Sequence, residues 1–275
     1  MKKLGLLFAI FVLSVFAISC ASNNVGSSTD ASKKMKKVTI ACTPVPHAEI
    51  MNEIKDMMQE KGFELIVKEF SDYVTPNLAV DQGEVDANYF QHQPYLDEFN
   101  AERGTKVRTI VAVHYEPFGV YAGTSKSLSI NIGDKVAVPN DVTNEARALN
   151  LLQDAGLIKL KAGVGLKATK LDIIENNNNL EIVELESAQI PRSLDSVALA
   201  CMNGNYAMEA GYKATDALYL EPSTSTAAKT YANIVCVKEG NENLDYSKAL
   251  IECLKSERVK KFIEGKYEKS VIYMD

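Results

Sequence analysis

The stretch that decides how this sequence folds is residues 86–96, which read DANYFQHQPYL. It starts as a short apolar and aromatic run and then passes through polar side chains to Pro94. Such a pattern predicts a buried strand whose carboxyl end opens into a loop and a new helix. In α/β proteins that end of a strand is the usual place for a ligand. A strand tip with core aromatics and surface amides has the same pattern, so the stretch alone leaves both interpretations open.

Around this stretch, short β-type runs alternate with amphipathic helical runs from residue 37 onward. This alternation predicts an α/β fold with mostly parallel sheets flanked by helices. The expected strands are 38–42, 63–70, 85–90, 107–113, 135–138, 181–185 and 197–201. The expected helices are 48–61, 76–82, 93–103, 143–154, 188–194, 206–212, 247–255 and 258–264.

The chain is expected to form two lobes. A proline and a glycine interrupt the extended run at residues 114–121, where we expect it to cross between lobes. Extended runs at 217–220 and 232–237 would carry it back. Lobe 1 then comprises residues 37–115 plus 232–275, and lobe 2 comprises residues 116–231 with the crossovers. Two such lobes make a clamshell with a cleft between the strand ends of both.

The amino terminus has the form of an export signal. Two lysines precede the apolar run 4–18, which is shorter than a comfortable membrane span. Residues 17–20, AISC, resemble the lipobox of bacterial lipoproteins, which implies that residues 1–19 are removed and Cys20 is acylated. The alternative is an ordinary secreted protein with an incidental cysteine. The remaining residues up to 36 contain a polar run, 21–34, that predicts a flexible tether.

Composition removes several classes of function. A formal net charge of -6 gives no footprint for nucleic acid. There is no phosphate-binding glycine loop and no nucleophile elbow, and we expect no catalytic residues and no cofactor. The remaining cysteines lack the close spacing of metal sites and are expected to be buried thiols, with a Cys201–Cys236 disulfide as the alternative.

Arg147 is the strongest candidate for binding chemistry. It falls in the first turns of the expected helix 143–154, where a cation works against the helix dipole. A ligand carboxylate would explain that placement, because arginine binds it through two parallel hydrogen bonds. A salt bridge to Glu145 or Asp141 is the structural alternative. Asn203 and Asn205 follow the strand 197–201 in the same way, and their amides suit a zwitterion.

Several segments together resemble the methionine-binding lipoproteins, the NlpA-type substrate-binding components of methionine ABC importers. The resemblance runs in order from about residue 37 to residue 275. It is carried by residues 44–50 (PVPHAEI), 71–96, 138–160, 188–194 (AQIPRSL) and 203–211 (NGNYAMEAG).

This resemblance implies a two-lobed, type II periplasmic-binding-protein-like clamshell without enzymatic activity. Such a protein captures methionine or a close analogue and delivers it to the permease and ATPase of the importer. It is held in the bacterial cell envelope by its lipid anchor. The alternatives are an adhesin or interaction module, or a binder of another amino acid or a short methionine peptide.

The resemblance also assigns the site. Arg147 would bind the ligand carboxylate, with Asn203 and Asn144 beside it. Asn233 is a further polar candidate. The pocket for the ligand side chain would be lined by Tyr73, Phe90, His92, Tyr89 and Tyr115. Aromatic rings of this kind pack well against a thioether.

Overall fold

The computed structural model describes residues 35–222 and 229–275. The expected signal peptide, the lipidation site Cys20 and the tether up to residue 34 lie outside the described residues. Within the described ranges, no helix has both the length and the apolar character needed to cross a membrane.

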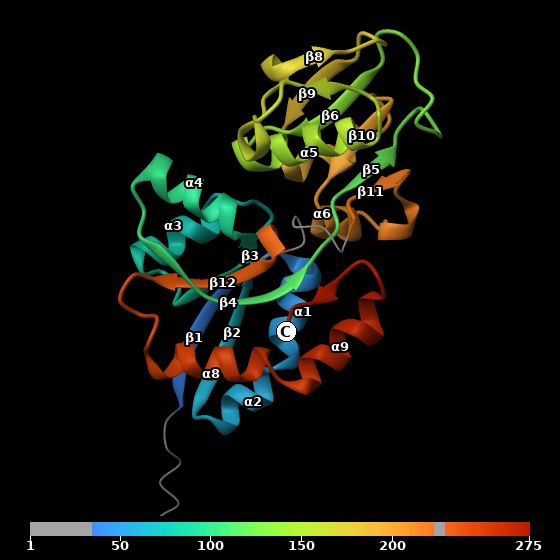
Figure 1. The fold of residues 1–275 in the computed structure, drawn as a ribbon. Coiled ribbons are helices and arrows are strands. Elements are labelled where there is room, and N and C mark those ends of the chain that lie inside the picture. The colour runs from blue at the N-terminus through green and yellow to red at the C-terminus, as the bar shows by residue number, and fades with distance from the viewer. Residues whose placement is uncertain (1–34, 223–228) are drawn as a thin grey trace, which may run out of the picture. The chain divides into compact units, whose positions relative to one another are not determined.

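The first sheet has six strands in the order β13-β4-β12-β3-β1-β2, and we call this sheet with its helices lobe 1 (Figure 1). Strand β1 lies parallel to both β2 and β3. Strand β12 lies antiparallel to β3 and β4, and β13 pairs antiparallel with β4. The bounds are β1 Lys36–Cys42, β2 Phe63–Glu69, β3 Ala87–His92, β4 Val107–Tyr115, β12 Asn233–Lys238 and β13 Ile272–Tyr273.

The second sheet has five strands in the order β11-β5-β10-β6-β9 and forms lobe 2 with its own helices. Strand β6 lies parallel to β9 and β10, whereas β5 pairs antiparallel with β10 and β11. The bounds are β5 Gly119–Ala122, β6 Lys135–Pro139, β9 Glu181–Leu185, β10 Leu199–Met202 and β11 Tyr219–Leu220. A separate two-stranded ribbon joins β7, Lys159–Leu160, to β8, Ile173–Glu175.

The two-lobed α/β class is confirmed, but the expectation of mostly parallel sheets needs a correction, because each sheet is mixed. The antiparallel pairs involve the strands that carry the chain between lobes and their neighbours. Strand β12 enters lobe 1 at Asn233, opposite His92 at the end of β3, so it runs against β3. A strand that enters a sheet from the edge where its neighbour ends can only pair antiparallel with it.

Most helices begin and end close to the expected residues. They are α1 Glu49–Glu53, α2 Lys55–Glu60, α3 Thr75–Gln82, α4 Gln93–Arg103, α5 Val142–Asp154, α6 Gly204–Glu209, α8 Asp245–Leu254 and α9 Glu257–Tyr267. The expected helix 48–61 is divided at Ile54, where ψ is 6°, and is preceded by a single turn at Pro44–Ala48. The expected helix 188–194 is instead the 3₁₀ turn Ser187–Ser193. Pro191 within it has no N–H to donate, which explains the loss of a regular helix.

Helices cover both faces of the lobe 1 sheet, as the alternation of side chains along β1 shows. Ile40 and Cys42 belong to a core that includes Ile50 and Met58 from α1 and α2. Ala41 points to the other face and belongs to a core with Leu96 of α4. Met51 and Met58 are fully buried, and Met57 packs against the same core while partly buried.

The cysteines at positions 42, 201, 236 and 253 are free and buried, so the Cys201–Cys236 disulfide is not formed. Cys201 lies on β10 in lobe 2 and Cys236 on β12 in lobe 1, in two different sheets. Burial raises the pKa of the Cys236 thiol to about 12, which keeps it protonated and unreactive.

The core of lobe 2 yields a stability prediction. Leu149 on α5 is fully buried, whereas Leu171 is 89% exposed. Leu149→Ala should lower the free energy of unfolding by about 2 to 5 kcal/mol, because it removes apolar contacts and leaves a cavity. The control Leu171→Ala should change it by less than about 0.5 kcal/mol. Denaturant titration of both variants measures the difference, and equal losses would contradict this assignment of the core.

Candidate ligand-binding site

An inner cavity lies at the strand ends of both lobes. Its volume is about 20 Å³. From lobe 1 come the end of β3, the start of β12 and the segment before α3. From lobe 2 come the first turns of α5 and α6. The lining residues are Tyr73, Phe90, Gln91, His92, Tyr95, Glu116, Asn144, Arg147, Asn203, Gly204, Asn205 and Asn233.

Arg147 is 5% exposed and is held by Glu221. Its Nε donates to Glu221 Oε1 at 3.1 Å, and its Nη2 donates to Glu221 Oε2 at 2.5 Å and to the Glu116 carbonyl at 3.1 Å. The guanidinium carbon lies 4.1 Å from the centre of the Tyr231 ring and 5.0 Å from that of Phe118. The cation is therefore already neutralised by a carboxylate of the protein.

This partner differs from both structural alternatives named for Arg147. Asp141 instead caps α5 by accepting from the backbone N–H of Asn144 at 3.0 Å. Glu145 accepts from the backbone N–H of Lys170 at 3.0 Å. Burial alone would raise the pKa of Glu221, but the adjacent Arg147 outweighs burial and holds that pKa below its usual value.

Asn144 links the two lobes at the cavity. Its Oδ1 accepts from His92 Nε2 at 3.1 Å and from Asn203 Nδ2 at 2.9 Å. Its Nδ2 donates to both carboxylate oxygens of Asp141, at 2.9 and 3.0 Å. The Asn144 amide is thus committed to other side chains, and its role is to hold His92 and Asn203 in place.

Two asparagines present unpaired buried atoms to this site. Asn203 donates through Nδ2, but its Oδ1 has no hydrogen-bond partner. Asn205 accepts from the Tyr73 hydroxyl at 2.5 Å, but its Nδ2 has no partner. A buried polar group without a partner costs roughly 1 to 3 kcal/mol, so an unused acceptor and an unused donor here mark places for a polar ligand.

Part of the cavity lining is aromatic. The Tyr73 ring lies 5.6 Å from Phe90 and 5.8 Å from Tyr95, and the Phe90 ring lies 6.0 Å from Tyr95. His92 adds an uncharged ring, because its Nδ1 accepts from the Tyr95 backbone N–H while its Nε2 donates to Asn144. Burial lowers the pKa of His92 to about 3.

At the wall of the cavity, Glu116 is hydrogen-bonded to His114 and lies near His47. His114 Nε2 donates to Glu116 Oε1 at 2.6 Å, and His47 Nε2 lies 3.5 Å from the same oxygen. His47 Nε2 also donates to Asn233 Oδ1 at 3.0 Å. Burial lowers the pKa of His47 to about 4 and of His114 to about 3, and burial raises the pKa of Glu116.

The same three side chains form the described group that comes nearest to a metal site, with ligand atoms within 4.8 Å of one another. Two ligands of one tetrahedral zinc ion are about 3.3 Å apart, given a metal–ligand distance of roughly 2.0 to 2.1 Å. The 2.6 Å from His114 to Glu116 is shorter than that and fits a charge-assisted hydrogen bond.

Seven of the nine residues expected in the site line the inner cavity, and Tyr89 and Tyr115 do not. The Tyr89 hydroxyl donates to His114 Nδ1, and the Tyr115 hydroxyl donates to Glu221 Oε2. Both tyrosines therefore support residues of the site from behind. No sequence pattern pointed to Glu116, Glu221 or Tyr95 as residues of the site. The one signal that could have indicated Glu221 is an acid between apolar Leu220 and Pro222 in an extended run.

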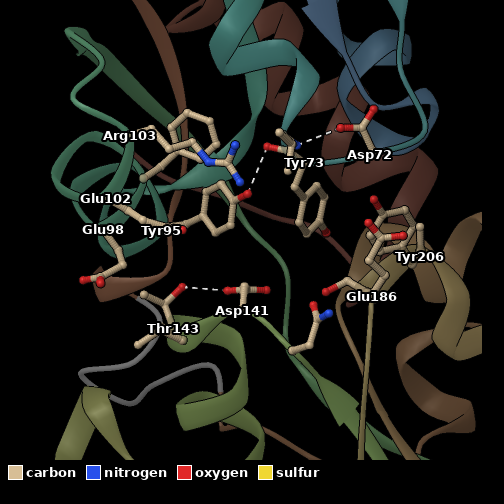
Figure 2. Close-up of a pocket in the computed structure, with 16 residues that line it drawn as sticks. Asp72, Tyr73, Tyr95, Glu98, Glu102, Arg103, Asp141, Thr143, Glu186 and Tyr206 are labelled. Carbon is tan, nitrogen blue, oxygen red and sulfur yellow. Dashed lines mark hydrogen bonds between the residues drawn. The ribbon is translucent and has the colours of Figure 1, made fainter.

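A larger outer cavity of about 400 Å³ adjoins the inner one, and both are lined by Tyr73 and Tyr95 (Figure 2). Most of its charged lining side chains are acidic, namely Asp72, Glu98, Glu102, Asp141 and Glu186, with Arg103 as the cation. Of the nine expected site residues it contains Tyr73 alone. The buried cation and the unpaired amide atoms belong to the inner cavity, which we take as the candidate site.

Two mixed α/β lobes with a polar and aromatic cavity at their strand ends define a substrate-binding protein of the periplasmic type. Residues 38–274 match the family model of the NlpA lipoproteins, and the chain belongs to that family.

Known relatives share this sequence and fold over most of their length. The methionine-binding lipoprotein MetQ of Bacillus subtilis is 38% identical over 278 residues, which covers 99% of this chain and 98% of the relative. A lipoprotein from Ruminococcus gnavus has a crystal structure with a TM-score of 0.86 and 54% identity, covering 87% of this chain and all of the other. The structure of a nutrient-binding protein from Burkholderia cenocepacia bound to methionine has a TM-score of 0.82 and 41% identity, covering 86% of this chain and all of the other.

The Arg147–Glu221 pair makes a testable contribution to stability. Glu221→Gln should cost about 3 to 5 kcal/mol at pH 7, because it leaves a buried guanidinium without its counter-charge. A carboxylate whose pKa is lowered by folding stabilises the fold above its ordinary pKa, and that contribution is lost as pH falls through the lowered value. The difference between the parent protein and the variant should therefore be full at pH 7 and shrink below about pH 4.

The matched control is Glu145→Gln, which alters an acid on α5 that does not pair with Arg147. Its loss of unfolding free energy at pH 7 should be well below that of Glu221→Gln. Chemical denaturation of the variants at several pH values measures both effects. A loss of unfolding free energy in Glu221→Gln that increases toward low pH would contradict the pairing of Glu221 with Arg147.

Proposed function

We propose that this protein is the substrate-binding lipoprotein of an ABC importer and that its inner cavity binds methionine. The observation that carries the proposal is a buried arginine in the lining of a cavity that is also lined by aromatic side chains. Membership of the NlpA lipoproteins supports it. So do the relatives, one named a methionine-binding lipoprotein and another solved with methionine bound.

Arg147 is the proposed partner of the ligand carboxylate. Its Nε and Nη2 point to Glu221 and to the Glu116 carbonyl, which leaves Nη1 for the ligand. The unpaired Nδ2 of Asn205 is a second donor for the same carboxylate. Asn203 lies beside them, and Asn144 and Asn233 hold its surroundings through their hydrogen bonds.

Tyr73, Phe90, His92 and Tyr95 are the proposed pocket for the thioether side chain. Contacts between sulfur and aromatic rings contribute about 0.3 to 1.5 kcal/mol each. The uncharged state of His92 suits an apolar ligand end, because a buried imidazolium beside it would demand a counter-charge.

The size of the cavity implies that the lobes move during binding. A space of about 20 Å³ holds roughly one water molecule, whereas methionine has about nine non-hydrogen atoms. We therefore infer that the ligand enters an open form of the clamshell. The proposed lobes are residues 37–115 plus 232–275 and residues 116–231, and the chain crosses between them before β5 and before β12.

The test of this function is ligand identity. The processed protein should be isolated with methionine bound, and mass spectrometry of the supernatant after denaturation should detect it. Added methionine should raise the melting temperature of ligand-free protein, since a ligand that binds the folded state stabilises it. A different amino acid in the supernatant, or no thermal shift with methionine, would reject the proposal.

The arginine gives the matched pair of variants for the same assay. Arg147→Lys keeps a positive charge for Glu221 but loses the planar fork, and should weaken methionine binding by at least about tenfold. Arg108→Lys changes an exposed arginine, paired with Glu239, and should leave affinity unchanged. Equal affinities of the two variants for methionine would show that Arg147 does not bind the ligand.

We further propose that Cys20 carries the lipid that anchors the protein in the cell envelope. Cys20→Ala should move the protein from the membrane fraction to the soluble fraction, because acyl chains supply the membrane affinity. Cys42→Ala, at a buried thiol, should leave it in the membrane fraction. Immunoblots of the two fractions measure this, and membrane retention of the Cys20 variant would refute the anchor.

A further inference from the structure

Tyr206 is an aromatic side chain of lobe 2 that the proposed site does not use. It lies on α6 and is 4% exposed. It lines the outer cavity, but it is not part of the lining of the inner cavity. Two of its neighbours in the outer cavity, Tyr73 and Tyr95, line both. An effect of Tyr206 on a ligand in the inner cavity would therefore pass through a residue that the two cavities share.

Tyr73 is that residue, because the ring of Tyr206 packs against it. The two ring centres are 4.9 Å apart, and the ring planes meet at 31°. This distance is shorter than those from Tyr73 to Phe90 and Tyr95, which are 5.6 and 5.8 Å. Figure 2 shows Tyr73 and Tyr206 in the lining of the outer cavity. A close aromatic contact of this kind favours particular orientations of the two rings.

Tyr206 is itself held against the segment that carries Tyr73. Its hydroxyl donates to the carbonyl of Ser71 at 3.1 Å. Within lobe 1, Asp72 Oδ1 accepts from the backbone N–H groups at the start of α3, at 2.8 and 2.7 Å. The backbone around Tyr73 is therefore fixed by lobe 1, and what remains to be fixed is the orientation of its ring.

Lobe 2 contacts both the hydroxyl and the ring of Tyr73. The hydroxyl donates to Asn205 Oδ1 at 2.5 Å, and the ring meets Tyr206, the next residue of α6. A tyrosine side chain has two rotatable bonds that place its ring. One contact at the tip of the side chain and one at the ring are enough to define both.

We propose that Tyr206 is a positioning residue for ligand binding, which holds the Tyr73 ring in the orientation that contacts the ligand side chain. It raises the affinity for the ligand through Tyr73 alone. This inference rests on the proposed function, because it assumes that the inner cavity binds methionine and that Tyr73 belongs to the thioether pocket.

The experiment is a double-mutant cycle on Tyr206 and Tyr73 with L-methionine as the probe. Tyr206→Leu should weaken methionine binding by at least about fourfold in the wild-type background, as expected for the loss of an aromatic pair. In the Tyr73→Leu background the same change should alter affinity by less than about 1.5-fold, because the ring that Tyr206 positions is gone. Titration calorimetry measures the dissociation constants, and thermal shifts at high methionine concentration measure any that are too weak for it.

Two controls accompany the cycle. Tyr206→Phe keeps the ring and loses the hydrogen bond to Ser71, and it should bind methionine at least about twofold more tightly than Tyr206→Leu. Tyr212→Leu removes the ring of another aromatic pair of lobe 2, whose centre lies 5.7 Å from that of Tyr121. Tyr212 lines neither cavity, so this variant should keep the affinity of the wild-type protein.

An equal loss of affinity on Tyr206→Leu in both backgrounds would overturn the assignment, since Tyr206 would then act independently of Tyr73. The absence of a loss in the wild-type background would overturn it too. So would equal affinities of Tyr206→Phe and Tyr206→Leu, and this comparison decides if Tyr73→Leu binds no methionine.

If Tyr206→Leu does not fold, Tyr206→Met takes its place in the cycle, because methionine is long and apolar but has no ring. Failure of both variants to fold would also overturn the assignment, since the ring would then be needed for folding. Failure of the wild-type protein to bind methionine would instead refute the proposed function.

Discussion

Burial of the Arg147 guanidinium is the constraint on which the cavity depends. A buried cation is tolerated only when it is paired and its hydrogen bonds are satisfied. Glu221 supplies the charge, the Glu116 carbonyl supplies a further acceptor, and Tyr231 supplies an aromatic face 4.1 Å away. Glu116 and Tyr231 lie on the two crossings between the lobes, and Glu221 directly follows β11. The segments that join the two sheets therefore supply the partners of Arg147.

Hydrogen bonds between the two lobes add to the covalent crossings. Tyr73 donates to Asn205, His92 to Asn144, and the Tyr206 hydroxyl to the carbonyl of Ser71 at 3.1 Å. Each hydrogen bond contributes roughly 0.5 to 1.5 kcal/mol net. A sum of a few kcal/mol can hold the lobes together and still be reversed. That range is suited to a protein that must open to load and to release a ligand, since a ligand shifts such an equilibrium only by its difference in affinity for the two forms.

Local sequence was sufficient for most of the elements and for one wall of the site. The aromatic run at the end of β3 and the start of the helix that carries Arg147 could be predicted from the pattern of apolar and polar residues. The partner of Arg147 could not. Glu221 is 74 residues away, and what places it there is the antiparallel pairing of β11 with β5. Pairing between distant strands leaves no periodic pattern in the sequence. For the same reason the sheets were expected to contain more parallel strands than they do.

The contacts and charge states of the histidines could not be predicted from the sequence either. His47, His92 and His114 lie in three separate segments, and nothing in their spacing indicates that His47 and His114 share one carboxylate. Their neutrality follows from burial together with hydroxyl and amide partners, which only the folded chain brings together. A sequence can thus indicate that a cavity holds an aromatic end and an arginine. The net charge of that cavity, and hence whether it takes an anion or a zwitterion, is fixed by contacts between segments far apart in the chain.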